Sequence, residues 1–253
     1  MQFLFKAIVT ITVVIISMSQ VFASDVTLYV TRHGKTMFNT VHRAQGWSDT
    51  PLTKLGIEVA EQLGRGLKGI DFISVYSSDL GRARETARVV LAAKGDQNNI
   101  IEMPGLREIC FGDFEGDLDP NMWNPAAKYL GYPSDKALMQ AFGDKKIGLD
   151  KMINAIKAVE KSGQAESYAT VRDRMFTSLQ TIAKQAQTQG GGNVLVVSHG
   201  LAILTVINEL VDQPLPPGLD NASITKIRYT DDDKFIVETI NDTSYIAKGK
   251  LDH

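Results

Sequence analysis

The apolar positions of the chain follow two periods, one typical of strands and one typical of amphipathic helices. Short runs rich in β-branched and aromatic residues predict strands at 26–31, 73–77, 100–103, 194–198, 224–229 and 235–240. Longer segments between them carry an apolar residue at every third or fourth position. Strands that alternate with helices predict an α/β fold, a three-layer αβα sandwich with a mostly parallel, doubly wound sheet.

The helices that should cover this sheet can be placed from their capping residues. We expect one helix capped by Thr53, one capped by Ser78 or Asp79, and two more within 165–189 and 201–211. The last two predicted strands surround an aspartate-rich turn, which predicts a hairpin that adds strands at the edge of the sheet.

Residues 117–164 break this alternation, because they contain no clear strand pattern and include Pro120, Pro125 and Pro133. Such a segment between sheet elements predicts a helical insertion. Insertions at the binding edge of a sheet commonly carry function, so we expect this one to act as a lid over a pocket.

The first 23 residues do not fit the domain. Residues 1–6 carry one positive charge and residues 7–16 are apolar apart from threonine. Residues 21–23 are small or compact, as is typical before the cleavage site of a signal peptide. This pattern predicts a secretory signal peptide cleaved after Ala23, a domain from 24 to 253, and a secreted or periplasmic location. A retained anchor is the alternative, but polar residues within 17–20 interrupt the run before the ~20 residues that a membrane span needs.

Composition narrows the class of protein further. A chain of 253 residues with 43% hydrophobic and 22% charged residues can bury a large core. Its formal net charge of −2 gives no broad basic surface, so no nucleic-acid partner is expected and positive charge must gather locally. The single Cys110 cannot form an internal disulfide, and we interpret it as a small buried hydrophobe rather than a nucleophile. Nothing in the composition indicates an oligomeric state.

Candidate chemistry comes from the ends of three predicted strands. Arg32 and His33 follow the first strand, Arg82 follows the second, and His199 follows the fourth. Arg32 and His33 alone would be interpreted as ordinary loop residues. The carboxyl ends of parallel strands meet at one edge of the sheet, where ligands bind, so residues from all three strand ends are expected there together. Arg82 also lies in a first helical turn, where the helix dipole disfavours a cation by ~0.3–1 kcal/mol. A bound anion would explain it, although neighbouring acids such as Asp79 could also neutralise the charge.

Two Arg, two His and an acid suit phosphoryl transfer through an imidazole nucleophile. Guanidinium groups stabilise the charge on the equatorial oxygens, so no metal or other cofactor is required. The arginines would also lower the pKa of His33 toward the neutral form that attacks. Glu108 or Glu115 could then protonate the departing alkoxide.

These residues fall in blocks that resemble the histidine phosphatase superfamily, in its phosphoglycerate mutase-like branch. The blocks are Arg32-His33-Gly34-Lys35-Thr36 with Asn39, the loop 43–53, Ser77-Ser78 to Arg82-Ala83 with Thr86-Ala87, Leu106-Arg107-Glu108, and Val197-Ser198-His199-Gly200. The resemblance implies His33 as nucleophile, Glu108 as proton donor, a phosphate pocket, and a substrate side. The phosphate pocket would comprise Arg32, Gly34, Asn39, Arg82 and His199, and the substrate side Gln45 and Gly46. Lys35 replaces an acid frequent at that position and is expected to face outward.

The same resemblance separates two activities. Mutases of the family carry Arg, any residue, Tyr and Gly after the catalytic Glu, whereas Glu108 is followed here by Ile109, Cys110, Phe111 and Gly112. No Arg occurs between Arg107 and Arg172, and lysines such as Lys128 or Lys136 are poorer bidentate donors.

We therefore predict an exported, metal-independent phosphatase that hydrolyses small phosphomonoesters through a phosphohistidine. The alternatives are a phosphoglycerate mutase or sugar-bisphosphate phosphatase, and, in another class, a catalytically silent protein that binds phosphorylated ligands. Trp47 either packs on its own loop or forms a wall of the substrate pocket.

Overall fold

The computed structural model describes residues 25–251, so the predicted signal peptide lies outside the described residues. The strands are β1 (Val26–Arg32), β2 (Phe72–Ser77), β3 (Ile100–Glu102), β4 (Gly192–Ser198), β5 (Ile224–Tyr229) and β6 (Phe235–Asp242). They form one sheet in the order β3-β2-β4-β1-β5-β6. Strands β3, β2, β4 and β1 are parallel to one another, β5 pairs antiparallel with β1, and β6 pairs antiparallel with β5. The predicted α/β class and mostly parallel sheet are confirmed.

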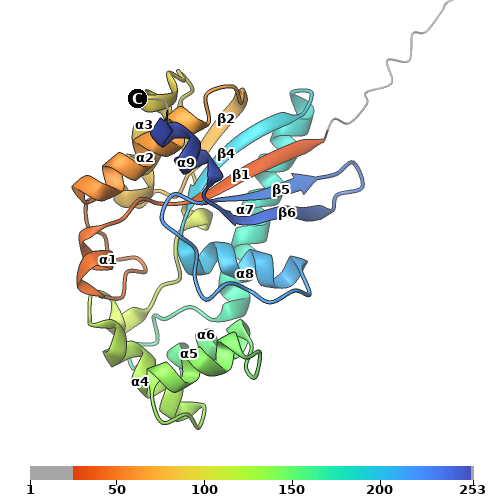
Figure 1. Cartoon of the computed structure of the whole chain (residues 1–253). Helices are drawn as coiled ribbons and strands as arrows, with labels where there is room; N and C mark the ends of the chain where they lie inside the picture. Colours follow the sequence, from red (N-terminus) through yellow and green to blue (C-terminus); the bar gives the residue numbers. More distant parts are fainter. Residues whose placement is uncertain (1–24, 252–253) are drawn as a thin grey trace, which may run out of the picture.

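Helices cover both faces of this sheet (Figure 1). The helices are α1 (Met37–Val41), α2 (Lys54–Gly66), α3 (Gly81–Lys94), α4 (Asp119–Tyr129), α5 (Asp135–Gly143), α6 (Leu149–Val159), α7 (Tyr168–Thr188), α8 (Gly200–Leu210) and α9 (Ser244–Leu251). Two short 3-10 turns lie at Pro104–Leu106 and Gly112–Phe114. In Figure 1, α2, α3 and α9 lie on one side of the sheet, and α7 and α8 lie on the other.

Both faces of β1 are buried, which explains the consecutive apolar residues from Leu28 to Val30. Val26, Leu28 and Val30 belong to the buried cluster shared with α7 and α8. Tyr29 points the other way, into the cluster shared with α2 and α3. A parallel strand that is covered on both faces therefore needs apolar residues at consecutive positions.

The start of α3 differs from the prediction. Its N-cap is Leu80, which makes no side-chain capping bond, so Ser78 and Asp79 do not cap this helix. The carboxylate of Asp49, from the loop before α2, instead accepts a bond from the Arg82 backbone N–H at 3.3 Å. Asp79 is occupied elsewhere, because its carboxylate binds the Nε of Arg107 at 2.8 Å. The predicted capping by Thr53 is correct, since its side chain accepts from the Gly56 N–H at the start of α2.

The insertion consists of α4, α5 and α6, drawn in green at the bottom of Figure 1. These helices share a small buried cluster that includes Ala127, Leu138 and Met152. Its base is tied to the loop after α1, because Ala44 N–H donates to the Asp117 carbonyl at 2.8 Å and Gly116 N–H donates to the Ala44 carbonyl at 2.9 Å. The insertion also rests on α7 and α8 through α6. It is therefore fixed beside the carboxyl ends of β1 and β4.

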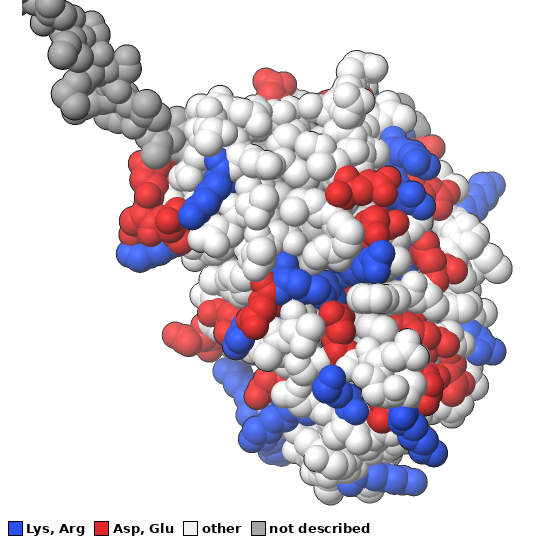
Figure 2. All heavy atoms as spheres, turned by 180° about the vertical axis from the view of Figure 1, so that it is seen from behind, with Lys and Arg blue, Asp and Glu red and all other residues white. Residues whose placement is uncertain are grey.

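The surface mixes charges of both signs. Figure 2 shows Lys and Arg interspersed with Asp and Glu on the face seen from behind. Among the helices of residues 25–251, none has the length and apolar character that crossing a bilayer would require.

Glu160 locks the end of the insertion to the rest of the domain. Its carboxylate accepts backbone bonds from Asp113 at 3.1 Å, Ser162 at 2.6 Å and Gly163 at 2.9 Å. Burial acts to raise the pKa of Glu160, but these donors and the Ser162 hydroxyl outweigh it and lower the pKa to about 2. The carboxylate form therefore stabilises the folded state.

We predict that Glu160→Gln lowers the free energy of unfolding by about 1.5–3 kcal/mol near neutral pH, the usual worth of hydrogen bonds to a charged group. A depressed pKa gives stability that is present above the ordinary value of 4.5 and lost as the pH falls through about 2. Urea unfolding of the wild type and the variant should therefore show that the difference in unfolding free energy shrinks as the pH is lowered. Glu58→Gln, at an exposed position of α2, is the control. A pH-independent difference would contradict this account.

Candidate active site

His33 follows β1 directly and is held in one orientation. Its backbone N–H donates to the Ser198 carbonyl at 3.0 Å, which joins the end of β1 to the end of β4. Its ring Nδ1 lies 2.8 Å from the Gly34 carbonyl oxygen. A carbonyl oxygen only accepts, so Nδ1 carries the hydrogen and Nε2 keeps its lone pair. The local backbone thus selects the tautomer in which Nε2 is available to attack.

The surroundings of His33 favour the neutral ring. Burial, followed by the charges of Arg82 and Arg32, lowers its pKa well below the ordinary value of 6.5. His199 lies beside it, with ring centroids 5.2 Å apart, and is fully buried. Burial and the charge of Arg82 also lower the pKa of His199.

Arg82 is fixed by the loop before α2. Its guanidinium donates to the carbonyls of Ser48 at 2.9 Å and Gly46 at 2.7 Å, and to the Asp49 carboxylate at 3.0 Å. The side chain is fully buried at the start of α3. On the opposite side of the site, Arg32 donates through Nη1 to the Leu219 carbonyl.

Four buried nitrogens at this site have no hydrogen-bond partner within the described residues: Nε of Arg32, Nε of Arg82, and both ring nitrogens of His199. Unpaired buried polar atoms are costly, so a cluster of them calls for an explanation. A phosphoryl group supplies several acceptor oxygens and negative charge, which suits guanidinium donors. The arrangement therefore fits a tetrahedral oxyanion held against His33.

Glu108 lies at the N-terminus of α8. Its carboxyl group accepts from the backbone N–H groups of Ala202 at 2.8 Å, Leu201 at 3.0 Å and its own neighbour Ile109 at 3.0 Å. Burial raises the pKa of Glu108, while these N–H groups and Arg82 oppose the rise without cancelling it. A buried carboxyl group with a raised pKa is suited to give up a proton during the reaction.

Glu115, the other candidate acid, has a different role. Its carboxylate accepts from the backbone N–H groups of Gly46 at 3.1 Å, Trp47 at 2.7 Å and Ser48 at 2.9 Å, and from that of Phe111 at 2.9 Å. It is therefore engaged in holding the loop that holds Arg82. Of the two candidate acids, Glu108 is the one that lines the cavity beside His33.

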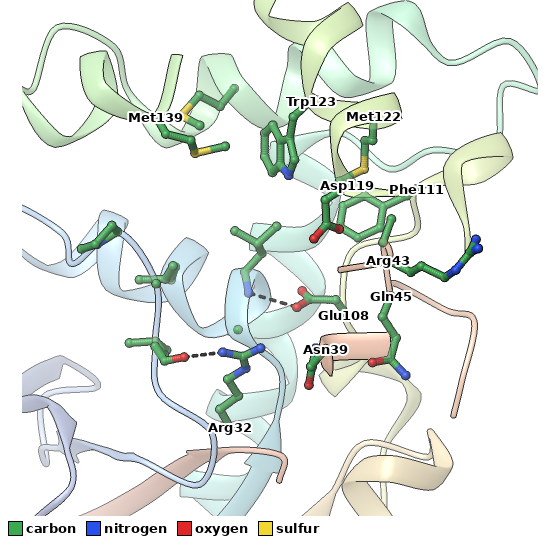
Figure 3. A pocket seen from close by; sticks show the side chains of 18 of the residues that line it. Arg32, Asn39, Arg43, Gln45, Glu108, Phe111, Asp119, Met122, Trp123 and Met139 are labelled. Atoms are coloured by element: carbon green, nitrogen blue, oxygen red, sulfur yellow. Dashed lines mark hydrogen bonds between the residues drawn. The ribbon is translucent and has the colours of Figure 1, made fainter. Parts of the chain in front are cut away.

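These groups border a cavity of about 510 Å³ between the sheet edge and the insertion (Figure 3). Of the residues expected at the site, those that line the cavity are Arg32, His33, Asn39, Gln45 and Glu108. Arg82 and His199 are fully buried and are not among the residues that line the cavity. The structure thus brings the predicted strand-end residues together at one place.

Gly34 and Gly46 differ from expectation, because neither lines the cavity. The Gly34 N–H donates to the Thr86 hydroxyl at 2.9 Å and its carbonyl accepts from the His33 ring, so both backbone groups of Gly34 are engaged in orienting His33. Gly46 is packed so closely that an added Cβ would lie 2.1 Å from the Ile109 carbonyl oxygen. Its contribution is the carbonyl that accepts from Arg82.

Two other expectations change. Lys35 lines the cavity rather than facing outward. Trp47 does not line the cavity, and it packs on residues 107–108 rather than on its own loop, because its Nε1 donates to the Glu108 carbonyl at 3.0 Å and the Arg107 guanidinium lies 4.7 Å from its ring. The aromatic wall of the cavity comes instead from Trp123 in α4 and Phe111.

Asn221 was not expected at the site. It lines the cavity, and its Nδ2 donates to the His33 carbonyl at 2.9 Å. It lies in the loop before β5, where no strand-end pattern marks it. Asn39 lines the cavity, and its Oδ1 accepts from the Thr36 N–H at 3.2 Å. Gln45 is engaged at both ends of its amide, by Thr36 and Thr50.

No group of three or more His, Cys, Asp or Glu side chains within residues 25–251 is arranged to hold a metal ion.

An α/β sheet that places a neutral histidine, buried arginines and a protonatable glutamate at one edge defines an enzyme of phosphoryl transfer. Comparison with known proteins agrees, since the family model described as "Histidine phosphatase superfamily (branch 1)" matches residues 28–133 and 148–243. The chain belongs to the histidine phosphatase superfamily and is an enzyme of its phosphoglycerate mutase-like branch.

The relatives include mutases and phosphatases. The chain is similar to the crystal structure of phosphoglycerate mutase from Bacillus anthracis, with a TM-score of 0.85 and 44% identity over 91% of this chain and 99% of that one. It is 26% identical to "Probable phosphoglycerate mutase GpmB" of Yersinia pestis, over 89% of this chain and 97% of the relative. A putative α-ribazole-5′-P phosphatase from Escherichia coli matches with a TM-score of 0.63 and 25% identity, over 86% and 97% of the two chains.

We predict that Gly46→Ala destabilises the protein and weakens its binding of inorganic phosphate. The added Cβ must displace the Ile109 carbonyl and the Glu115 carboxylate, which shifts the carbonyls that hold Arg82. We expect a loss of about 2 kcal/mol or more in unfolding free energy and at least about tenfold in phosphate affinity, equal to about 1.4 kcal/mol. Calorimetric titration and urea unfolding measure both.

Gly143→Ala is the matched control, because an added Cβ at the end of α5 meets no atom within 4 Å. It should leave both quantities within experimental error. A Gly46→Ala protein with wild-type stability and phosphate affinity would contradict the role given to this loop.

Proposed function

We propose that the chain is a phosphatase that hydrolyses phosphomonoesters through a phosphohistidine at His33, with no metal or cofactor. The observation that carries the proposal is the bond between His33 Nδ1 and the Gly34 carbonyl, which leaves Nε2 as the free nucleophile beside two buried guanidinium groups. Export is part of the proposal on the sequence of residues 1–23 alone.

In the first half-reaction, Nε2 of His33 attacks phosphorus and the bond from phosphorus to the ester oxygen breaks. Glu108 acts in its protonated form, which burial favours by raising the pKa, and gives its proton to the departing oxygen, so the alcohol leaves neutral. Arg32, Arg82 and His199 hold the three equatorial oxygens while charge moves through them.

In the second half-reaction, water attacks the phosphohistidine. Glu108, now a carboxylate, accepts a proton from the water as the new bond forms. The bond between phosphorus and nitrogen breaks, which returns the neutral imidazole and releases inorganic phosphate. Glu108 ends the cycle protonated, as it began.

Hydrolysis is favoured over mutase activity by the residues after Glu108. Ile109, Cys110 and Phe111 are buried and apolar, so they offer no cation or phenol to grip a second charged group. Lys128 and Lys136, the lysines considered as substitutes, are exposed and outside the cavity lining. The mutase names of two relatives make mutase activity the alternative. A silent binding protein is disfavoured because both His33 and Glu108 are in place.

We predict that Glu108→Gln lowers kcat for alkyl phosphates by about 10²–10⁴-fold, the usual contribution of a general acid. A good leaving group such as p-nitrophenolate departs with little help from an acid. The transfer of the phosphoryl group from such an ester to His33 should therefore be nearly unaffected in the variant. Burst kinetics with both esters separate this step from the later hydrolysis. An equal loss on both esters would exclude Glu108 as the acid.

The pH dependence gives a second readout of the same variant. Wild-type activity on alkyl phosphates should fall as the pH rises through the raised pKa of Glu108, because the acid is lost. It should fall on the acid side only below 6.5, where His33 becomes protonated. In Glu108→Gln the alkaline fall should disappear from the phosphorylation step. His42→Asn, outside the cavity lining, is the control and should keep the wild-type profile.

Product analysis separates hydrolysis from mutase activity. With 3-phosphoglycerate in the presence and absence of bisphosphoglycerate, phosphorus NMR should show slow release of inorganic phosphate. Rapid formation of 2-phosphoglycerate would favour the mutase.

A further inference from the structure

The half of the cavity away from His33 has a composition of its own. The walls contributed by the insertion are apolar, with one acidic exception: Met122, Trp123, Met139, Phe142, Leu149 and Met152, together with Asp119. Phe111, Leu201 and Leu204 continue the apolar wall toward the site of phosphate transfer. We call this half the apolar chamber. In Figure 3, Trp123, Met122 and Met139 lie above the gap that separates them from Glu108 and Arg32.

Three methionines in such a wall are informative. The thioether side chain is unbranched and polarizable, so it adapts to apolar groups of several shapes and contacts aromatic rings favourably. A small hydroxy acid such as glycerate would leave this wall in contact with water, because a carboxylate finds no donor there. The wall suits an apolar body that displaces that water.

Asp119 is the charged side chain that the insertion adds to the cavity. It is the first residue of α4, and its backbone N–H donates to the His42 carbonyl at 2.9 Å. No hydrogen bond or ion pair engages its carboxylate within the described residues, and in Figure 3 that carboxylate lies between Trp123 and Glu108. A free carboxylate at this place repels a leaving group that carries its own negative charge.

The positively charged side chains near the cavity do not offset the negative charge of Asp119 in the chamber. The Arg43 guanidinium donates to the Gly116 carbonyl at 2.7 Å, and in Figure 3 it points away from the chamber. The aliphatic part of this side chain, rather than its charged group, therefore faces the cavity. Lys35 follows His33 by two positions and is not part of the insertion. The chamber itself therefore presents apolar surface and one negative charge.

We propose that the alcohol half of the substrate is an uncharged, predominantly apolar group, an alkyl chain or ring system, and that Asp119 excludes phosphomonoesters whose alcohol carries a second anion. The proposal rests on the proposed function and specifies its substrate class. Apolar area in the chamber provides the affinity, and the carboxylate provides the discrimination.

The primary test uses the wild-type protein and a series of primary alkyl phosphates from ethyl to hexyl, whose leaving-group acidities are closely similar. Burying a methylene favours binding by about 0.8 kcal/mol, or about three- to fourfold in kcat/KM. Over the four added methylenes, kcat/KM for hexyl phosphate should therefore exceed that for ethyl phosphate by roughly 80- to 250-fold. Equal kcat/KM values along the series would overturn the inference and leave the phosphatase assignment standing.

Asp119→Asn tests the discrimination with a matched pair, hexyl phosphate and 6-phosphooxyhexanoate, which differ by a terminal carboxylate. The wild type should prefer the neutral ester, and the variant should raise kcat/KM for the acidic ester about tenfold, the equivalent of about 1.4 kcal/mol. Hexyl phosphate should change little. A variant that affects both esters equally would show that Asp119 does not set the charge preference.

Binding of alkylphosphonates, which have no ester bond to hydrolyse, separates this inference from the proposed function. Calorimetry should show affinity rising with chain length, and Trp123→Leu should flatten the rise while ethylphosphonate binds as before. If chain-length dependence appears in binding without any turnover of the esters, the substrate class stands and the phosphatase assignment falls. Affinity independent of chain length would overturn the inference.

Discussion

The site depends on one hydrogen bond, from Nδ1 of His33 to the carbonyl oxygen of Gly34. A neutral imidazole has one protonated and one unprotonated nitrogen, and a carbonyl that binds one of them decides which is free. Here the carbonyl belongs to the next residue, so the backbone turn after β1 determines which ring nitrogen of His33 keeps its lone pair. Thr86 in turn fixes Gly34 by accepting its N–H at 2.9 Å. Loss of this bond would let the ring rotate or change tautomer.

Support for the phosphate pocket extends over several chain segments. Arg82 is oriented by carbonyls of the loop 45–48, and this loop is held by the Glu115 carboxylate through its backbone N–H groups. Glu108 is held at the start of α8, which follows β4. The insertion, anchored by Glu160, then supplies the apolar side of the cavity. Burial and the two guanidinium charges keep His33 neutral.

The sequence predicts the sheet well, because strand periodicity and the placement of Arg32, Arg82 and His199 at strand ends are local patterns. It also predicts the family through contiguous motifs. It fails where a role depends on long-range contacts. Asp49 replaces the predicted cap of α3 from a separate loop, Glu115 is engaged by amides that lie far from it in the sequence, and Asn221 reaches His33 across the sheet edge. The short helix α9 was also missed, since it is stabilised by packing on α2.

The most direct measurement is the position of the phosphoryl group in a trapped intermediate. The protein is mixed with a phosphate ester that has a good leaving group, and the reaction is quenched in alkali to preserve phosphohistidine. The quenched protein is then examined by mass spectrometry and by phosphorus–nitrogen NMR. The account predicts one phosphoryl group on Nε2 of His33, and none in a His33→Asn protein. Phosphate on Nδ1, on another residue, or on no residue during steady turnover would contradict it.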